Sequence, residues 1–217
     1  MPSKPPRQRP GGRPPRRPGG RTAPRRAAPL PEPDRHDLYQ RAVQCVEAEI
    51  DFVDATFRRR RGRRAVLLRE DFCGTANTSC EWVRRRRENR AVGVDLDAPT
   101  LAWGIRHNLA RLDAEQRTRV TLLRQDVLEA RRPPRAPGYD VVLAMNFSYW
   151  IFKERERMRR YFTAVRRSLA PDGLFFLDHY AGSEVHTVTT ERRAIRTRPR
   201  FTYIWDQASL NPITNEM

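Results

Sequence analysis

From residue 65 onward, short apolar runs of strand length alternate with segments that are mostly long enough for a helix. This alternation is typical of a parallel sheet whose strands are joined by right-handed helical crossovers. The five runs are 65–70, 91–97, 119–126, 139–146 and 173–180. The sequence therefore predicts an α/β fold with a doubly wound, mostly parallel sheet.

Apolar residues at helical spacing precede and separate these runs. Those from Leu38 to Phe57 predict one amphipathic helix, which ends near Gly62. Proline-rich text between the third and fourth runs leaves room only for a brief turn of helix. Further helices are expected over 75–86, 98–112 and 153–170.

The first 33 residues differ in composition from the rest of the chain. They contain 11 of the 18 prolines, and residues 1–31 carry nine of the 43 basic side chains and no acid. Such text cannot bury enough apolar surface to offset its ordering entropy. We therefore expect a disordered basic arm at 1–33 and one domain over 34–217. The arm either binds nucleic acid or another anionic surface, or is a solvated extension without such a role.

Composition also argues against several other classes of protein. The three cysteines have neither the paired spacing of a metal site nor that of a disulfide framework, which fits a reducing compartment. No stretch approaches the length of a membrane span, and no apolar segment of a secretory signal follows the N-terminal arginines. The sequence thus predicts a cytoplasmic protein without a metal ion.

Polar side chains stand where four consecutive strands are predicted to end. Glu70, Asp95, Asp126 and Asn146 occupy these positions. In an open parallel sheet, ligands bind beyond the carboxyl ends of the strands, near the point where the strand order reverses. Because acids are depleted within strands, their recurrence at one edge of the sheet predicts a ligand site there.

The turn after the first strand indicates the kind of ligand. A dinucleotide fold would place several glycines there and receive a diphosphate at a helix N-terminus. In "EDFCGTA" (70–76) only Gly74 remains, and Glu70 would repel a diphosphate. A cationic ligand with a ribose and no phosphate fits better, and S-adenosyl-L-methionine is such a molecule.

From about Leu38 to its end, the sequence resembles the class I, Rossmann-like S-adenosylmethionine-dependent methyltransferases. In that family an acid ends the first strand and a loop of the D-x-G-x-G-x-G type follows; here Phe72 and Ala76 replace two of the glycines. The run "SLAPDGLFFL" resembles the entry to the fifth strand, with Asp172 and Gly173 as the turn. The resemblance implies S-adenosyl-L-methionine as cofactor and methyl transfer as activity.

The resemblance also implies roles for individual residues. Glu70 would reach the amino group of the methionine moiety, and Gly74 would permit close approach of the backbone. Asp95 matches the acid that binds both ribose hydroxyls, while Asp126 and Val127 match the pair that meets the adenine. The expected cofactor-binding residues are Glu70, Cys73, Gly74, Thr75, Asp95, Leu96, Asp126, Val127 and Asn146.

Other residues near this site have more than one interpretation. No histidine stands near Cys73 in the sequence, so we interpret it as a small packing residue rather than a nucleophile. Asp71 is either a second acid of the cofactor site or a cap for the following helix. Tyr39 and Gln44 either contact the cofactor from a lid-like first helix or lie on an ordinary helix surface.

Candidates for the acceptor side follow the fourth and fifth strands. Asn146 and Tyr149 keep the spacing of the Asn-Pro-Pro-Tyr loop of methyltransferases that act on amino nitrogens, without its prolines. His179 is the best-placed base among the four histidines, because an imidazole exchanges protons near neutral pH. We expect His179, Tyr149 and Asn146 to act on the acceptor, against the alternative of a structural role.

A small-molecule acceptor is expected, because the sequence shows no second recognition domain. One alternative is a methyltransferase that acts on amino groups of RNA or protein. The other is a non-catalytic nucleotide-binding scaffold whose basic arm binds nucleic acid.

The end of the chain predicts an incomplete sheet. The family resemblance implies seven strands, with the last inserted antiparallel. Here the text stops at Met217, after a sixth predicted strand at 200–210. We therefore expect the last strand to be missing through truncation of the chain at its C-terminus.

Overall fold

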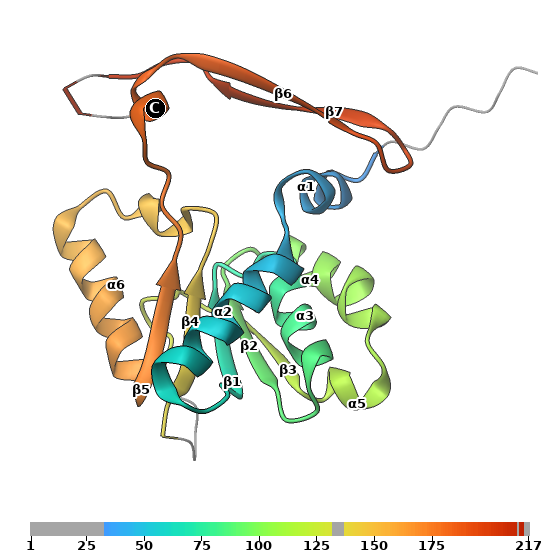
Figure 1. Ribbon diagram of the computed structural model, residues 1–217, viewed down its shortest axis with the longest axis vertical. Helices are drawn as coiled ribbons and strands as arrows, with labels where there is room; N and C mark the ends of the chain where they lie inside the picture. Colours follow the sequence, from blue (N-terminus) through green and yellow to red (C-terminus); the bar gives the residue numbers. More distant parts are fainter. Residues whose placement is uncertain (1–32, 132–136, 212, 215–217) are drawn as a thin grey trace, which may run out of the picture. The chain divides into compact units, whose positions relative to one another are not determined.

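The computed structural model describes residues 33–131, 137–211, 213 and 214. Its central sheet has five parallel strands in the order β3-β2-β1-β4-β5 (Figure 1). The predicted doubly wound, parallel α/β fold is therefore confirmed, and the strand order reverses between β1 and β4. The strands are β1 (Leu67–Asp71), β2 (Arg90–Asp95), β3 (Val120–Arg124), β4 (Tyr139–Ala144) and β5 (Leu169–Leu177).

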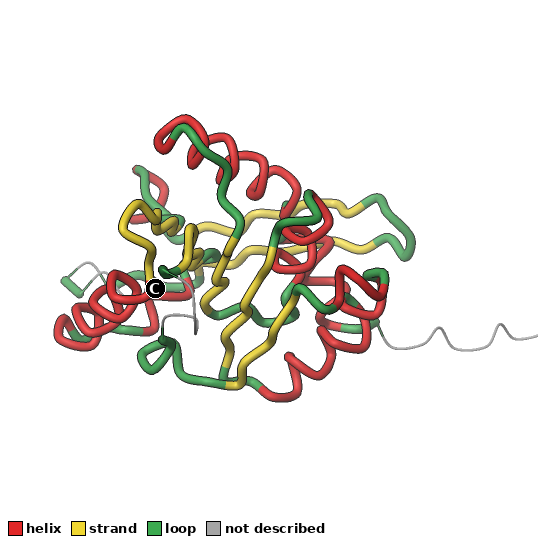
Figure 2. The backbone as a smooth tube through the Cα atoms, turned by 90° about the horizontal axis from the view of Figure 1, so that it is seen from below, coloured by secondary structure: helices red, strands yellow, loops and turns green. Residues whose placement is uncertain are grey.

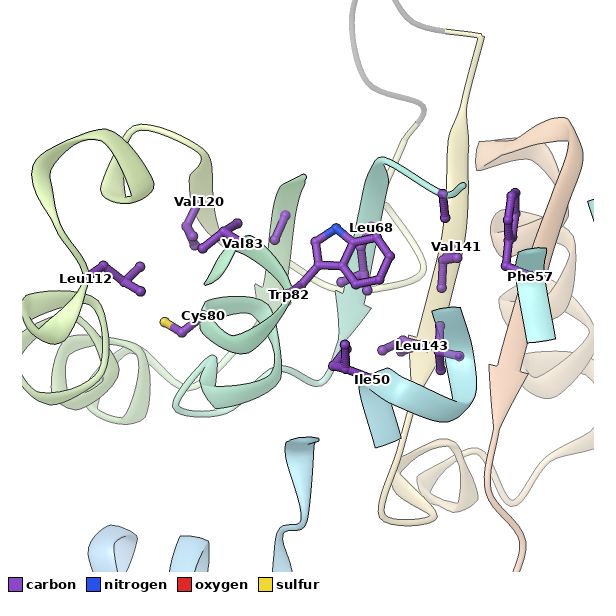
Figure 3. Close-up of a cluster of buried hydrophobic side chains, with 13 residues drawn as sticks. Ile50, Phe57, Leu68, Cys80, Trp82, Val83, Leu112, Val120, Val141 and Leu143 are labelled. Carbon is purple, nitrogen blue, oxygen red and sulfur yellow. The ribbon is translucent and has the colours of Figure 1, made fainter. Parts of the chain in front are cut away.

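Helices flank both faces of this sheet, as Figure 2 shows. On one face, α2 and α3 pack against β1 and β4 through the cluster drawn in Figure 3, which includes Phe57, Leu68, Trp82 and Leu143. On the other face, α6 buries Tyr161 against the strands. The α-helices are α1 (Arg35–Val43), α2 (Val46–Arg61), α3 (Asn77–Arg85), α4 (Ala98–His107), α5 (Ala114–Arg117) and α6 (Arg155–Ser168). Short 3-10 helices are η1 (Leu109–Arg111), η2 (Ser148–Ile151) and η3 (Ser183–His186).

The single helix predicted before the first strand is wrong, because the structure has two. Gln44 has an extended backbone with φ −86° and ψ 137°, and it separates α1 from α2. The side-chain oxygen of Gln44 accepts a hydrogen bond from Asn77 Nδ2 at 3.0 Å. The break therefore coincides with a tertiary contact, which helical periodicity does not report.

The sixth predicted strand forms, but it does not belong to the central sheet. The strand β7 (Phe201–Gln207) pairs antiparallel with β6 (Thr189–Ile195) in a separate two-stranded sheet. Figure 1 shows this hairpin beside α1. The sequence analysis missed β6, whose central residues Glu191, Arg192 and Arg193 are charged and exposed.

The fifth strand begins earlier than predicted. Its pairing with β4 shifts between Tyr139 and Val141, so that Leu169 pairs with Tyr139 and Leu174 pairs with Val141. The predicted turn at Asp172 and Gly173 lies inside this irregularity. Asp172 is held there by the guanidinium of Arg63, which also pairs with Asp140 of β4.

Some expectations fall on parts of the chain that the structure does not describe. The expected basic arm at 1–33 lies outside the described residues, except for Pro33. Most of the proline-rich text between β3 and β4 does so as well, at residues 132–136. Within the described part of the chain, no helix is long and apolar enough to cross a membrane.

Candidate active site

A cleft of about 220 Å³ opens beyond the carboxyl ends of β1 and β4, where the strand order reverses. Its floor is formed by Glu70, near the end of β1, and by Gly74 and Thr75 of the turn that follows. The loop after β4 forms one wall, with Asn146 and Ser148. This is the edge of the sheet at which ligands bind in folds of this kind.

The turn after β1 keeps a left-handed backbone without the missing glycines. Phe72, Gly74 and Ala76 have φ values of 56°, 51° and 56°. For the two residues with side chains, this conformation costs about 1–2 kcal/mol each. Packing holds it: the Phe72 ring contacts the rings of Phe152 and Tyr161, and the Ala76 methyl group is fully buried.

Close packing fixes the same turn from behind. A Cβ added at Gly93 would lie 2.8 Å from the sulfur of Cys73, and one at Gly104 would lie 2.4 Å from the carbonyl oxygen of Thr75. That oxygen also accepts a hydrogen bond from Asn108 Nδ2 at 2.9 Å. Burial raises the pKa of the Cys73 thiol far above its ordinary value, which disfavours the thiolate. These contacts fit a packing residue.

Asp95 lies at the end of β2 and binds the turn directly. Its Oδ2 accepts from the Gly74 backbone N–H at 2.7 Å, and its Oδ1 accepts from the Asp97 N–H at 2.9 Å. Each carboxylate oxygen can accept a further hydrogen bond. The side chain thus fixes the glycine that forms the floor of the cleft and keeps acceptor capacity for a ligand.

Glu70 lines the cleft and is almost completely buried. Its Oε2 accepts from Ser79, from the backbone N–H at 2.9 Å and from the hydroxyl at 2.5 Å. Burial outweighs these hydrogen bonds and raises the pKa of Glu70 to about 7. A cationic group in the cleft would favour the ionised carboxylate.

Glu70 is expected to make stability depend on pH. Its pKa rises on folding from 4.5 to about 7, so over this interval the folded protein binds more protons than the unfolded chain. The contribution of Glu70 to the free energy of unfolding is therefore complete below pH 4.5 and is lost as the pH rises through about 7. Thermal unfolding of the wild type and Glu70→Gln at several pH values measures this, with Glu47→Gln, an exposed site on α2, as control. Equal pH dependence in the wild type and Glu70→Gln would contradict it.

Asp71 lines the cleft, so its role as a second acid of the cofactor site stays a prediction, but it does not cap α3. It is buried in an ion pair with Arg69, whose Nε lies 2.8 Å from Asp71 Oδ1. The hydroxyl of Tyr161 donates to Asp71 Oδ2 at 2.9 Å. The carboxylate therefore joins β1 to α6 instead of capping α3.

Four of the nine expected cofactor-binding residues do not line this cleft: Asp95, Leu96, Asp126 and Val127. Asp126 accepts a hydrogen bond from the Leu128 N–H at 2.9 Å, within the turn that follows β3. Val127 is buried in the cluster beneath α6, and Leu96 is 61% exposed. The Gln125 N–H donates to the Asp95 carbonyl oxygen at 2.9 Å, so the turn begins beside the end of β2.

Helix α1 covers part of the cleft. His36, Tyr39 and Gln44 line it, and Gln40 Nε2 donates to the Thr75 hydroxyl at 2.7 Å. The sequence analysis considered Tyr39 and Gln44 but missed His36 and Gln40. Their polar side chains look like a solvated helix face, and no local pattern in the sequence distinguishes the two cases.

The expected acceptor-side residues lie together next to the cleft. The Tyr149 hydroxyl lies 3.2 Å from His179 Nδ1. Asp178 accepts hydrogen bonds from the backbone N–H groups of Asn146 and Phe147 at 2.8 and 2.9 Å. These bonds hold both residues at positive φ, and Asn146 lines the cleft. The end of β5 thereby fixes the loop that follows β4.

Aromatic rings extend from this pair toward the hairpin. Trp150 contacts His179 edge-on, with ring centroids 5.5 Å apart. Phe147 lies 5.5 Å from Trp150 and 5.8 Å from Tyr180 between ring centroids. The acceptor side is therefore rich in aromatic surface, with one hydroxyl–imidazole pair within it.

Comparison with known proteins agrees with the fold. Residues 73–175 match the family model described as a methyltransferase domain. Among curated proteins, none matches the chain. Three solved structures share the fold at low sequence identity.

CalS10, an amino pentose methyltransferase from Micromonospora echinaspora solved with S-adenosylmethionine bound, has a TM-score of 0.63 and 18% identity over 81% of this chain and 69% of its own. DesVI from Streptomyces venezuelae has a TM-score of 0.64 and 18% identity over 81% and 70%. The plantazolicin methyltransferase BpumL has a TM-score of 0.52 and 10% identity over 65% and 50%. This chain thus spans between half and 70% of the lengths of these proteins. Residues 73–175 thus match a methyltransferase domain, and the fold is that of the class I, Rossmann-like S-adenosylmethionine-dependent methyltransferases.

Proposed function

We propose that this protein transfers the methyl group of S-adenosylmethionine to a small organic molecule bound beside the Tyr149–His179 pair. The observation that carries the proposal is the cleft at the strand reversal. A buried carboxylate, Glu70, and the Asp95-bound Gly74 turn meet there, and the carboxylate would repel a diphosphate.

The residues present fit this cofactor. Glu70 offers a carboxylate to the amino group of the methionine moiety, and Asp95 offers its remaining acceptor positions to the ribose hydroxyls. Leu96 and Asp126, which follow neighbouring strands at this edge of the sheet, would hold the adenine end. Gly74 and Thr75 would supply the backbone against which the cofactor packs.

The chain's own residues then orient the acceptor and remove its proton. When bound, S-adenosylmethionine supplies an electrophilic methyl group. The Tyr149 hydroxyl takes the proton that a hydroxyl or ammonium acceptor must lose and passes its own proton to His179 Nδ1, so that the imidazole holds the proton at the end of the step. Asn146, which Asp178 fixes at positive φ, positions the acceptor at the cleft. Holding the acceptor and the methyl donor in line within a partly enclosed site would further increase the rate of methyl transfer.

The aromatic walls support a small organic acceptor. Phe147, Trp150 and Tyr180 form apolar surface around few polar groups, which is typical of sites for small molecules. Two of the solved structures with this fold are described as an amino pentose methyltransferase, CalS10, and a plantazolicin methyltransferase, BpumL.

Replacing Asp95 tests the cofactor site. Asp95→Ala removes the acceptor of the Gly74 N–H and the proposed ribose contacts, so we expect S-adenosylmethionine to bind about 100-fold more weakly or worse. Isothermal titration calorimetry measures the Kd. Asp97→Asn, two residues away on the exposed cap of α4, is the matched control and should bind like the wild type. A wild-type Kd in Asp95→Ala would remove the basis of the proposal.

A labelled-methyl assay tests the acceptor. The full chain is incubated with methyl-labelled S-adenosylmethionine and size-fractionated cell extract. We expect label in the small-molecule fraction, and label only in protein or RNA would reassign the acceptor.

A further inference from the structure

An arginine of α1 binds the loop of the β6–β7 hairpin. Arg41 of α1 donates to the carbonyl oxygens of Thr197 and Pro199 at 3.0 and 2.7 Å and to the Thr197 hydroxyl at 2.8 Å. Its guanidinium also stacks on the Phe201 ring, 5.0 Å from the centroid. Asp37, one turn earlier in α1, holds the same guanidinium at 2.9 Å. Arg41 thus connects α1 to both ends of the hairpin loop.

One face of the hairpin is turned toward α1 and the acceptor side. Phe201, Tyr203 and Trp205 alternate along β7 and therefore share a face. Arg193, opposite Tyr203, donates to the Ala42 carbonyl oxygen of α1 and stacks on the Tyr203 ring at 5.3 Å. Trp205 contacts Tyr180 edge-on at 6.1 Å. The aromatic face of β7 therefore extends from α1 to the rings around His179.

Gln40, which precedes Arg41 in α1, contacts the turn that follows β1 (72–76), called the cofactor turn from here on. Gln40 donates to the Thr75 hydroxyl at 2.7 Å, immediately before Arg41 in the sequence. Successive residues of a helix project about 100° apart, so α1 contacts the cofactor turn and the hairpin at once. Burial raises the pKa of Tyr39, which lines the cleft, and the nearby Tyr203 and Asp178 raise it further. Helix α1 is therefore in contact with both the cleft and the hairpin.

Among the described residues, few other contacts hold the hairpin in place. An isolated two-stranded sheet is marginally stable in water. Its other face, with Arg192, Thr202 and Ile204, is exposed. Apart from the contacts with α1 and Tyr180, the buried Gln207 anchors one end through the carbonyl oxygens of Val185 and Thr187. The position of β7 near its loop therefore depends on α1.

We propose that Arg41 is a positioning residue that couples the cofactor site to the acceptor site. When a ligand in the cleft seats α1, Arg41 holds the hairpin so that Tyr203 and Trp205 form the outer wall of the acceptor site and select what enters it. This inference rests on the proposed function, because it takes the cleft as the cofactor site.

Hydrogen exchange on the full chain tests the coupling, with S-adenosylhomocysteine as the probe. In the wild type, the probe should slow amide exchange in 70–78 and also, about fivefold or more, in 201–207. In Arg41→Gln, the slowing at 70–78 should remain, while that at 201–207 is lost. Arg35→Gln is the matched control on the same helix, because its only described side-chain hydrogen bond reaches the adjacent His36. It should behave like the wild type.

Each outcome separates this inference from the proposed function. If the probe slows exchange nowhere in the wild type, the proposed function is wrong. If it slows 70–78 alone, or slows 201–207 equally in the wild type and Arg41→Gln, cofactor binding stands and the coupling is refuted. Circular dichroism of Arg41→Gln without ligand checks that the fold is retained, so that a lost response cannot come from unfolding.

Discussion

Tyr149→Phe is expected to lower kcat by about 100-fold or more while leaving the Kd for S-adenosylhomocysteine unchanged. The hydroxyl lost in this variant is the group that contacts His179 Nδ1 at 3.2 Å. His179→Gln should lose a similar factor. Because the two side chains act as one unit, the double variant should be no slower than the slower single variant. The rate is measured with the acceptor isolated in the labelled-methyl assay.

The solvent deuterium isotope effect on kcat separates a catalytic pair from a structural one. In the wild type, proton transfer through the pair should make kcat lower in D2O than in H2O, and this difference should vanish in both single variants. Tyr139→Phe, which removes the hydroxyl of a buried tyrosine on β4, is the control and should keep both the rate and the isotope effect. A wild-type isotope effect with a reduced rate in Tyr149→Phe would indicate that the hydroxyl only supports packing.

Arg69→Met is expected to lower the free energy of unfolding by about 3–5 kcal/mol. Arg69 and Asp71 are both fully buried and lie 2.8 Å apart. Burial raises the pKa of Asp71 while Arg69 lowers it, so the variant would leave a buried carboxylate without its countercharge. Chemical denaturation monitored by circular dichroism measures the loss.

The double variant Arg69→Met/Asp71→Leu should recover most of this stability, because replacing both members of a buried pair avoids an unpaired charge. Arg64→Met, at an exposed position just before the same strand, should change stability by less than about 0.5 kcal/mol. Should Arg69→Met unfold like Arg64→Met, Asp71 would have to be neutral in the folded protein.

The central sheet could be predicted because its strands are buried on both faces. Runs such as 139–146 stay apolar throughout, and the described β4 (Tyr139–Ala144) is buried at every residue. The hairpin could not be predicted in the same way. Three of the seven residues of strand β6 are charged, and the strand contacts β7 and α1 instead of a hydrophobic core. The break between α1 and α2 occurs at Gln44, which accepts a hydrogen bond from Asn77, 33 residues away in the sequence.

For the candidate site, topology predicted position better than orientation. Parallel strands bring Glu70 and Asp95 to one edge, and Glu70 lines the cleft while Asp95 binds its floor. The same reasoning gave no direction for Val127, whose side chain is buried beneath α6. Tyr149 and His179 are 30 residues apart, so their contact follows only from the adjacency of β4 and β5. The roles of all these residues stay predictions.

The turn at Phe72, Gly74 and Ala76 has a consequence for how such proteins are detected. Its left-handed backbone is held by the surrounding packing, so two of the three positions do not have to be glycine. A search for glycine-rich signatures would pass over chains of this kind. A template built on alternating backbone dihedral signs, followed by an acid at the end of the next strand, would find them.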